Sequence, residues 1–407
     1  MTNAMNVLIA VVISGLAATG CVEDDPVGDA DAGDALVGEE ASVHLDAGLD
    51  AELVDADGEP PDAEPDAAVV DAAPNPYVVE LPPSGLNDIT SFTNADLLVT
   101  YSEYRGDPSI APDVYYYDIA SLTEYQVTNR ASSQSSPDVY NEEIIFSDFQ
   151  FYNAGTQNYQ VELYHYDVAS GLETRLTNEV SMKHVPKLND QYILFRSTEG
   201  CASSTIYNLT LMNRQTGDST VVSECWQDPE THSISELYAA WTARPSPGHS
   251  KDIFVRDLQA GYTFRIDSTD AGSQYFPHTD DDHVVWQDDR DGRREVYMHT
   301  FSTGLEECLT PDGWEQGWPH LRDGIVSWCD YSFSQQWGHS GDCDIYVHEI
   351  ASGIGRRVTT LSQTWRPRFV DSGWLLYVRR ITGSQYKLFV HDLVGDGILS
   401  GDGHVLP

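Results

Sequence analysis

Basic residues are scarce in this chain of 407 residues. It contains 22 Lys and Arg against 65 Asp and Glu, which gives a formal net charge of −43. A balance of this sign repels the phosphates of nucleic acids and the headgroups of anionic lipids. The composition therefore disfavours nucleic-acid binding, and it favours a soluble, monomeric protein.

Motifs for catalysis and for cofactors are also missing. The sequence has no G-x-S-x-G, no H-E-x-x-H and no phosphate-binding glycine loop. These patterns place a nucleophilic serine, a zinc site and a bound nucleotide, respectively. We therefore assign no catalytic residue and expect neither a cofactor nor a bound metal.

Long apolar runs are absent too. The run VLIAVVISGLAA, at residues 7–18, is shorter than the roughly 20 residues that cross a bilayer, but it suits the core of a secretory signal peptide over residues 1–20. It leads into Ala-Thr-Gly-Cys, which resembles the lipobox of bacterial lipoproteins. That resemblance implies cleavage before Cys21 and acylation of its thiol. An ordinary signal peptide followed by an incidental cysteine is the alternative.

The residue after the cysteine is Val22 rather than Asp, which is compatible with sorting to the outer membrane. We therefore expect an exported protein that is lipid-anchored at the outer membrane or cell surface of a Gram-negative bacterium. Its contact with the membrane would be made through the N-terminal lipid only.

Residues 21–74 have a composition that cannot form a core. From Val22 to Pro74 there are 18 Asp or Glu and no Lys or Arg, which leaves −25 of the −43 for the rest of the chain. With almost no large apolar side chains, the segment cannot offset the entropy lost on ordering. We predict a disordered acidic spacer that holds the folded part away from the membrane. Binding of cations or of a basic partner is the alternative.

Residues 75–407 contain seven copies of one module. Each copy has an apolar run with a marker aromatic, then a second run such as DVYYYD or DIYVHE, and in most copies a short third run. In most copies a proline precedes the marker by nine or ten residues. The markers are Tyr101, Phe146, Phe195, Trp241, Trp286, Trp328 and Tyr377, and the prolines are Pro137, Pro186, Pro277, Pro319 and Pro367.

A period of about 45 residues with four short strands is typical of a propeller blade. Helical solenoids need an apolar period of 3.6 residues, which these runs lack. We therefore predict an all-β propeller of seven four-stranded blades, with six blades as the alternative. The last copy lacks a convincing fourth strand, so we expect residues 77–81 to complete it and to remove an exposed sheet edge.

The blade proline, the apolar-aromatic strand and the D-I-Y-V-x-D strand resemble the TolB-like surface propellers of bacteria and archaea. The resemblance covers about 320 residues, and it implies a propeller that binds proteins or surface polymers. It does not extend to a particular partner, because a lipobox and a spacer stand here in place of the N-terminal domain of TolB.

The candidate binding residues fall in segments that we expect to be loops on one face of the propeller, between strands 2 and 3 and between blades. Exposed aromatic rings suit sugar rings or protein hot spots, although such rings can also pack between blades. The candidates are Tyr275, Phe276, His278, Trp314, Trp318, His320, Trp337, Trp365, Arg366 and Arg368.

His278 and His320 both follow a blade proline directly, and His184 and His232 lie nearby in earlier copies. Histidines from adjacent blades could converge on a metal, but those that line a pore are often only hydrogen-bonded, so we predict no metal site. Asp288–Gly292 looks like half of a calcium loop. Its place between two strands favours a polar hairpin turn.

Five cysteines follow Cys21, and export permits disulfides. Cys329 and Cys343 bracket one loop, whereas Cys201 and Cys225 lie in segments that emerge on the same face. We predict these two bridges and expect Cys308 to stay free.

Taken together, the sequence predicts a membrane-tethered propeller that binds a protein or polysaccharide of the cell envelope without catalysis. The alternative is a carbohydrate-active enzyme of the lyase type, working at the pore mouth through His278, His320 and Arg368.

Overall fold

The computed structural model describes residues 76–81, 89–95, 97–103, 111–153, 158–179, 181–203, 205–266, 272–332, 343–360, 363–371, 373–382 and 385–399. The predicted signal peptide, Cys21 and the predicted spacer lie outside these ranges. Among the described residues, no helix is long and apolar enough to span a membrane.

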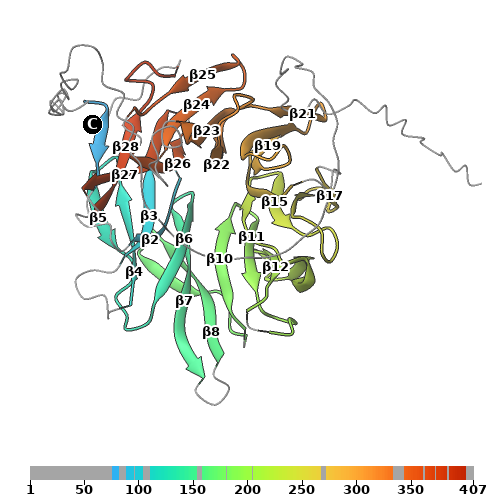
Figure 1. The fold of residues 1–407 in the computed structure, drawn as a ribbon. Helices are drawn as coiled ribbons and strands as arrows, with labels where there is room; N and C mark the ends of the chain where they lie inside the picture. The colour runs from blue at the N-terminus through green and yellow to red at the C-terminus, as the bar shows by residue number, and fades with distance from the viewer. Residues whose placement is uncertain are drawn as a thin grey trace, which may run out of the picture. The chain divides into compact units, whose positions relative to one another are not determined.

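The described strands form seven antiparallel four-stranded sheets that follow one another in a ring (Figure 1). Their first strands contact each other in cyclic order, including the first strand of the first sheet with that of the last. The predicted seven-bladed propeller is therefore confirmed, and the six-bladed alternative is wrong.

The first four blades run outward from the channel as follows. Blade 1 comprises β2 (Ile89–Ala95), β3 (Leu98–Glu103), β4 (Asp113–Asp118) and β5 (Thr123–Gln126). Blade 2 comprises β6 (Gln134–Tyr140), β7 (Glu143–Asn153), β8 (Asn158–Asp167) and β9 (Leu172–Arg175). Blade 3 comprises β10 (Lys183–Leu188), β11 (Tyr192–Ser197), β12 (Asn208–Asn213) and β13 (Ser219–Ser223), followed by the 3-10 turn η1 (Cys225–Gln227). Blade 4 comprises β14 (His232–Ile234), β15 (Tyr238–Ala243), β16 (Asp252–Asp257) and β17 (Thr263–Arg265).

The remaining three blades complete the ring. Blade 5 comprises β18 (Gln274–Thr279), β19 (His283–Asp288), β20 (Glu295–Thr300) and β21 (Leu305–Cys308). Blade 6 comprises β22 (Gln316–Arg322), β23 (Ile325–Asp330), β24 (Asp344–Glu349) and β25 (Ile354–Arg357). Blade 7 comprises β26 (Thr364–Asp371), β27 (Trp374–Thr382), β28 (Gln385–Asp392) and, from the start of the described chain, β1 (Val78–Glu80).

Strand β1 closes the ring, as the sequence predicted. It pairs antiparallel with β28, with Val79 opposite Val390. The ladder is extended at one end by the Leu81 N–H, which donates to the Leu388 carbonyl at 3.0 Å. The last blade therefore has its fourth strand, and the edge of β28 is covered.

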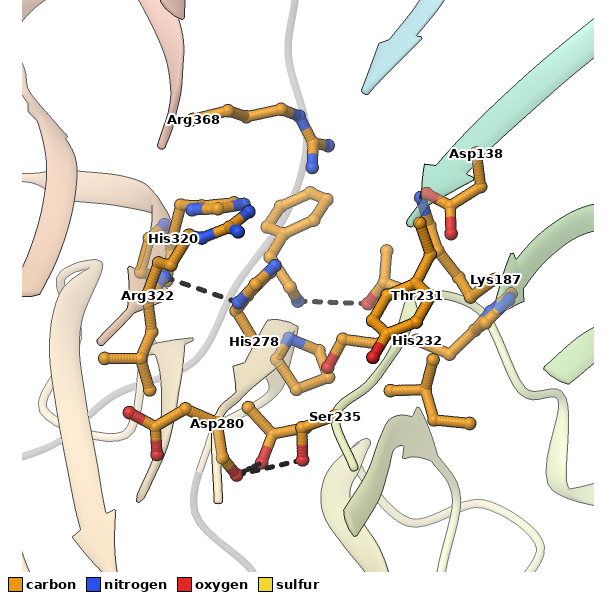
Figure 2. Close-up of a pocket in the computed structure, with 18 of the residues that line it drawn as sticks. Asp138, Lys187, Thr231, His232, Ser235, His278, Asp280, His320, Arg322 and Arg368 are labelled. Carbon is orange, nitrogen blue, oxygen red and sulfur yellow. Dashed lines mark hydrogen bonds and ion pairs between the residues drawn. The ribbon is translucent and has the colours of Figure 1, made fainter. Parts of the chain in front are cut away.

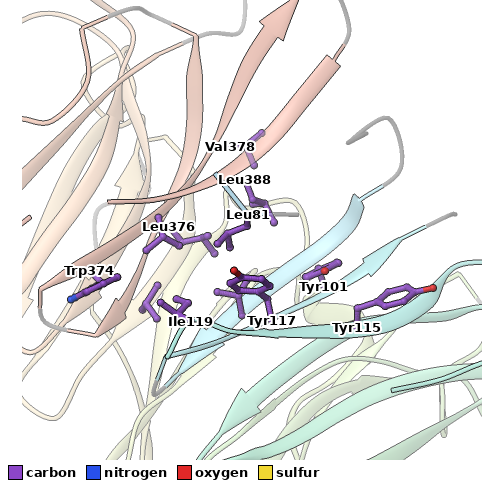
Figure 3. Packing of buried hydrophobic residues seen from close by; sticks show 12 residues of the cluster. Leu81, Tyr101, Tyr115, Tyr117, Ile119, Trp374, Leu376, Val378 and Leu388 are labelled. Carbon is purple, nitrogen blue, oxygen red and sulfur yellow. The ribbon is translucent and has the colours of Figure 1, made fainter. Parts of the chain in front are cut away.

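Leu81 anchors this closure in the core between blades 7 and 1 (Figure 3). It is 1% exposed and packs with Leu376 and Leu388 of blade 7 and with Tyr101 and Tyr117 of blade 1. One apolar side chain next to β1 thus joins the first and last blades.

The marker aromatics are buried and stack on a second ring of the same blade. Each marker lies on the second strand, directly opposite a residue of the third strand, and ring centroids are 5.9–6.1 Å apart. The pairs are Tyr101–Tyr115, Phe146–Tyr164, Trp241–Phe254, Trp286–Tyr297, Trp328–Tyr346 and Tyr377–Phe389. In blade 3, Thr210 stands opposite Phe195. Such cross-strand pairs stabilise a sheet and explain why the aromatics recur.

Some of the acidic residues are part of the scaffold. In blade 1 the buried start of β4 brings Asp113 close to Thr128, whose hydroxyl donates to the carboxylate at 3.0 Å and accepts from the Val114 N–H at 2.9 Å. Equivalent hydrogen bonds join Glu162 to Thr177 and Asp344 to Thr359. This accounts for the threonine that ends several copies.

We expect Leu81→Ala to lower the free energy of unfolding by about 2–5 kcal/mol, because it opens a cavity at the closure of the ring. Chemical denaturation monitored by tryptophan fluorescence measures the change. Leu172→Ala is the matched control: Leu172 is 63% exposed, so its removal should cost less than about 0.5 kcal/mol. Equal unfolding midpoints for Leu81→Ala and the unmodified protein would show that β1 does not hold the ring.

Candidate functional site in the central channel

The innermost strand of five blades has a β-bulge at the blade proline. The strand register shifts around Pro137, Pro186, Pro277, Pro319 and Pro367. Proline lacks an N–H, and it is tolerated here because the innermost strand has no further partner strand on its channel side. Blade 4 has no proline at this position, and β14 pairs without a shift.

The residue before each of these prolines has a positive φ of 51–55°. We call Ser136, Val185, Phe276, Trp318 and Arg366 the pre-proline residues. We call Asp138, Lys187, His278, His320 and Arg368, which follow the prolines, the post-proline residues. A left-handed backbone is uncommon outside glycine, so the bulge redirects the chain at the same place in each of the five blades.

Both sets line a cavity of about 1150 Å³ in the channel (Figure 2). Its wall is built mainly from the innermost strands of blades 2 to 7 and from turns that follow them, with Arg196 of β11 and with Glu230 and Thr231 before β14. Each of these blades thus presents side chains from the same structural position to one shared space.

Six of the ten predicted candidates line this cavity: Phe276, His278, Trp318, His320, Arg366 and Arg368. The expectation that they lie in loops is wrong, because all six are on β18, β22 or β26. The prolines made these strands look like loops in the sequence, since a proline argues against a strand unless it sits at a bulge or an edge.

The other candidates lie elsewhere. Tyr275 contacts the Phe276 ring, with centroids 6.2 Å apart, but it does not line the cavity. Trp314 is 40% exposed and precedes β22. Trp365 packs against two cores, so for this residue the alternative of packing between blades is correct. Trp337 lies outside the described residues.

The pre-proline residues form contacts around the channel. Phe276 stacks on Trp318, with centroids 4.0 Å apart and an interplanar angle of 27°. The Arg366 guanidinium lies over the Trp318 ring, 5.1 Å from its centroid. Blades 5, 6 and 7 are therefore joined at the channel wall by an aromatic and cation–π series.

Sequence reasoning missed the charged residues of the same wall. Asp138 and Lys187 are post-proline residues like His278, and the Lys187 Nζ lies 2.7 Å from the Asp138 Oδ1. Arg322, at the end of β22, also lines the cavity. The signal was available, because Asp138 and Lys187 stand directly after blade prolines, as His278 and His320 do.

Three post-proline side chains accept hydrogen bonds from the backbone of the next blade. The Leu321 N–H donates to the Nδ1 of His278, and the Phe369 N–H donates to the Nδ1 of His320, each at 3.3 Å. Equivalently, the Leu188 N–H donates to the Oδ2 of Asp138 at 3.0 Å. These hydrogen bonds tie successive innermost strands together, which gives the two histidines a structural role.

This arrangement requires both imidazoles to be neutral. A neutral imidazole that accepts at Nδ1 carries its hydrogen on Nε2. Burial, with the charge of Arg368, lowers the pKa of His278 to about 3, and burial lowers that of His320 well below 6.5. Their ring centroids are 3.8 Å apart, so a proton on one imidazole would oppose protonation of the other.

The histidines do not fit a metal site. An imidazole bound to a metal normally donates its second nitrogen's N–H to an acceptor. Here Nδ1 faces a backbone donor instead, so ligation through Nε2 would set two N–H groups against each other. The part of the chain described by the structure holds no group of three or more His, Cys, Asp or Glu placed for a metal.

His184 and His232 do not join this pair. The Nε2 of His232 donates to the Val185 carbonyl at 2.7 Å, and burial lowers its pKa to about 4. His184 packs between Phe149 and Tyr207, and burial likewise lowers its pKa to about 4. His184 and His232 therefore have surroundings of their own, apart from the His278–His320 pair.

Both predicted disulfides are present. Cys201–Cys225 and Cys329–Cys343 have Cα–Cα distances of 5.7 and 5.3 Å. The expectation that Cys308 is free is wrong, because it is disulfide-bonded and no described cysteine is free. The prediction paired the five cysteines after Cys21 among themselves, and an odd number forced one to be left over.

The acidic segment after β19 is a turn, as predicted. Asp288 accepts from the Trp286 Nε1 at 2.8 Å and pairs with Arg290, while Asp291 accepts from the Tyr297 hydroxyl at 2.8 Å. These carboxylates are held by groups of their own blade.

The fold places this protein among the seven-bladed β-propellers, and comparison with solved structures agrees. The β-propeller domain of the Trilobed protease from Pyrococcus furiosus matches with a TM-score of 0.56 and 10% identity, over 75% of this chain and 93% of that domain. An oligogalacturonate lyase in complex with manganese matches with a TM-score of 0.55 and 12% identity, over 77% of this chain and 97% of the lyase. At these identities the likeness shows the fold alone.

A prolyl endopeptidase matches over 75% of this chain, with a TM-score of 0.57 and 11% identity. The match covers 48% of the endopeptidase, so this chain spans about half of that protein's length. A TolB from Acinetobacter baumannii matches over 74% of this chain and 78% of that protein, with 13% identity. Its TM-score of 0.42 is too low for the two folds to be equated. No family model and no curated protein matches this sequence. The Pyrococcus domain is described as having an open velcro topology, whereas β1 completes the last blade here.

We expect the hydrogen bond of His278 to make the propeller sensitive to acid. The pKa of His278 is lower in the folded protein, about 3, than in the unfolded chain, near 6.5. Its contribution to stability is therefore complete above pH 6.5 and is lost as the pH falls toward 3. His278→Asn supplies an amide oxygen near the Nδ1 position without a titration, so it should lose less stability between about pH 7 and pH 4.5.

Urea unfolding at the two pH values measures this difference. His278→Ala is the control, because it leaves the Leu321 N–H without an acceptor and should cost about 1–3 kcal/mol at neutral pH. The same loss of stability on acidification in His278→Asn and the unmodified protein would contradict a neutral, buried His278.

Proposed function

We propose that this protein is a non-catalytic binding module of the cell envelope, which takes a protein or polysaccharide ligand into the central channel. In this proposal it is exported, and the acidic spacer holds the propeller away from the membrane. The ligand contacts the pre-proline and post-proline residues at the channel wall.

The contrast between repeated and varied positions carries the proposal. The stacked aromatics of the second and third strands recur in six blades, because every blade needs them for packing. The pre-proline position instead holds Ser, Val, Phe, Trp or Arg, and the post-proline position holds Asp, Lys, His or Arg. Packing alone does not call for such chemical variety around a cavity of about 1150 Å³, whereas ligand recognition does.

Two observations bear on the place of action and on the enzyme alternative. Disulfides persist in oxidising compartments, and the two bridges support export. His278 and His320, through which the enzyme alternative would work, already use their Nδ1 atoms to accept backbone N–H groups, which does not suit a bound metal. This favours binding over a lyase reaction at the channel mouth.

We expect Trp318→Ala to weaken ligand binding at least tenfold, a loss of about 1.4 kcal/mol, because buried aromatic anchors dominate binding surfaces. Immobilised protein is tested against envelope polysaccharides and against solubilised envelope proteins. Trp226→Ala is the matched control, since Trp226 is 52% exposed on η1 and lies outside the cavity. Unchanged binding in Trp318→Ala, with its fold confirmed by thermal unfolding, would overturn the channel as the site.

A further inference from the structure

The charged side chains of the channel wall lie beside charges of the opposite sign. The Lys187 Nζ lies 2.7 Å from the Asp138 Oδ1, and the Arg322 Nε lies 3.6 Å from the Asp323 Oδ2. Burial lowers the pKa of Arg368, and the charge of Asp138 opposes that shift. The residues that line the cavity include more carboxylates than cations. The described wall therefore has no excess of positive charge, and a ligand with a net charge of either sign would meet like charges there.

Asp280 places a carboxylate near His278 at the cavity wall (Figure 2). Burial lowers the pKa of His278, and the charge of Asp280 opposes that shift, so the two groups lie within electrostatic reach of each other. Burial also opposes the ionisation of Asp280, but hydrogen bonds from His283 and from the backbone lower its pKa below the usual value. The wall thus holds an ionised hydrogen-bond acceptor near the first of the two histidines.

The two neutral histidines supply hydrogen-bond donors to the same wall. Because the Nδ1 of His278 and of His320 accepts a backbone N–H, the Nε2 of each ring carries the hydrogen. Both rings line the cavity, and His320 is only 8% exposed. Among the residues that the structure describes, neither Nε2 has a hydrogen-bond partner. These two N–H groups are therefore available to a ligand that accepts hydrogen bonds.

Proline and aromatic rings give the wall an apolar part. Pro277, Pro319 and Pro367 line the cavity, each from a different blade. Phe276 and Trp318 precede two of these prolines and line it as well, with their ring centroids 4.0 Å apart. A cavity that combines apolar surface with a few polar groups suits a ligand that has both kinds of surface.

We infer that the channel binds an uncharged saccharide, whose hydroxyl groups accept hydrogen bonds from the Nε2–H groups of His278 and His320 and donate to Asp280. A hydroxyl group accepts and donates at one oxygen atom, which matches N–H donors near a carboxylate. It carries no charge, so it can bind either member of a charged pair without being repelled by the other. The C–H groups of the sugar face the proline rings. This inference rests on the proposed binding function and names its ligand class.

A peptide matches these groups less well. Its acceptor and its donor are separate atoms of the backbone, the carbonyl oxygen and the N–H. An extended peptide would also have to pair with the edge of an innermost strand, and the register shifts around Pro277, Pro319 and Pro367 interrupt those edges. A sugar makes no such demand on the backbone.

An array of neutral oligosaccharides of glucose, galactose, mannose and N-acetylglucosamine, with a uronate and an amino-sugar counterpart of each, tests the ligand class on the intact protein. We expect a neutral oligosaccharide to bind, and calorimetry should show its charged counterparts to be about tenfold weaker or more. Raising NaCl from about 0.05 M to about 0.5 M should change the affinity for the neutral ligand less than about twofold. The inference is overturned if no neutral oligosaccharide binds, or if a charged counterpart or a dipeptide binds more tightly.

Two variants separate the donors from their structural role. In His278→Asn and His320→Asn the amide oxygen still accepts the backbone N–H near the Nδ1 position, but no donor reaches the position of Nε2–H. Each variant should weaken the neutral oligosaccharide about tenfold. His348→Asn is the matched control, because His348 is on the third strand of blade 6 and outside the cavity. Full affinity in folded His278→Asn and His320→Asn overturns the site.

Monodeoxy analogues of the oligosaccharide that binds test the same contacts without a variant. Loss of a hydroxyl group that contacts a histidine should weaken binding about tenfold. If every monodeoxy analogue binds as tightly as the parent sugar, recognition through hydroxyl groups is wrong.

The two proposals fail differently. If an acidic polysaccharide or an envelope protein binds and Trp318→Ala abolishes that binding, the binding function stands and the uncharged ligand does not. If the unmodified protein binds no envelope component and no neutral oligosaccharide, both proposals fall.

Discussion

A ring of sheets is stable only if its first and last sheets are held together. In this protein the three residues of β1 and the adjacent Leu81 hold them together. Strand β1 pairs with β28, and Leu81 carries the contact from the last blade into the first. Each blade buries one face against the next, so an open ring would expose two apolar faces at once. The geometry of the channel, and with it the convergence of side chains from six blades, depends on this closure.

In the proposed binding function, one backbone device of the channel serves both structure and recognition. The bulge at each blade proline fixes the post-proline residue, and in Asp138, His278 and His320 one acceptor atom binds the next blade. The rest of each side chain remains at the cavity wall. Recognition groups that are also structural are held rigidly, which lowers the entropy lost when a ligand binds.

The fold could be predicted from the sequence because each blade repeats the same packing requirement. The marker aromatics stack across two strands, so their spacing reported the number of blades, and the missing last strand pointed to residues 77–81. The site was predicted only in part. Aromatic-rich segments were selected, which found Phe276 and Trp318 but passed over Lys187, although Lys187 follows Pro186 as His278 follows Pro277. The tautomers of the histidines depend on backbone donors in the next blade, and no property of the sequence reports them.

Strand β1 also determines how the protein responds to mechanical load. Any tension on the chain before residue 77 reaches the propeller through β1, and the β1–β28 ladder is the first set of hydrogen bonds to bear it. Three paired residues form a short ladder, whereas the other strands of blade 7 pair over longer stretches. Leu81 is buried just behind that ladder, so force must extract an apolar side chain before the ring can open. The closing strand thus has the shortest pairing of its blade, and one buried side chain anchors its end.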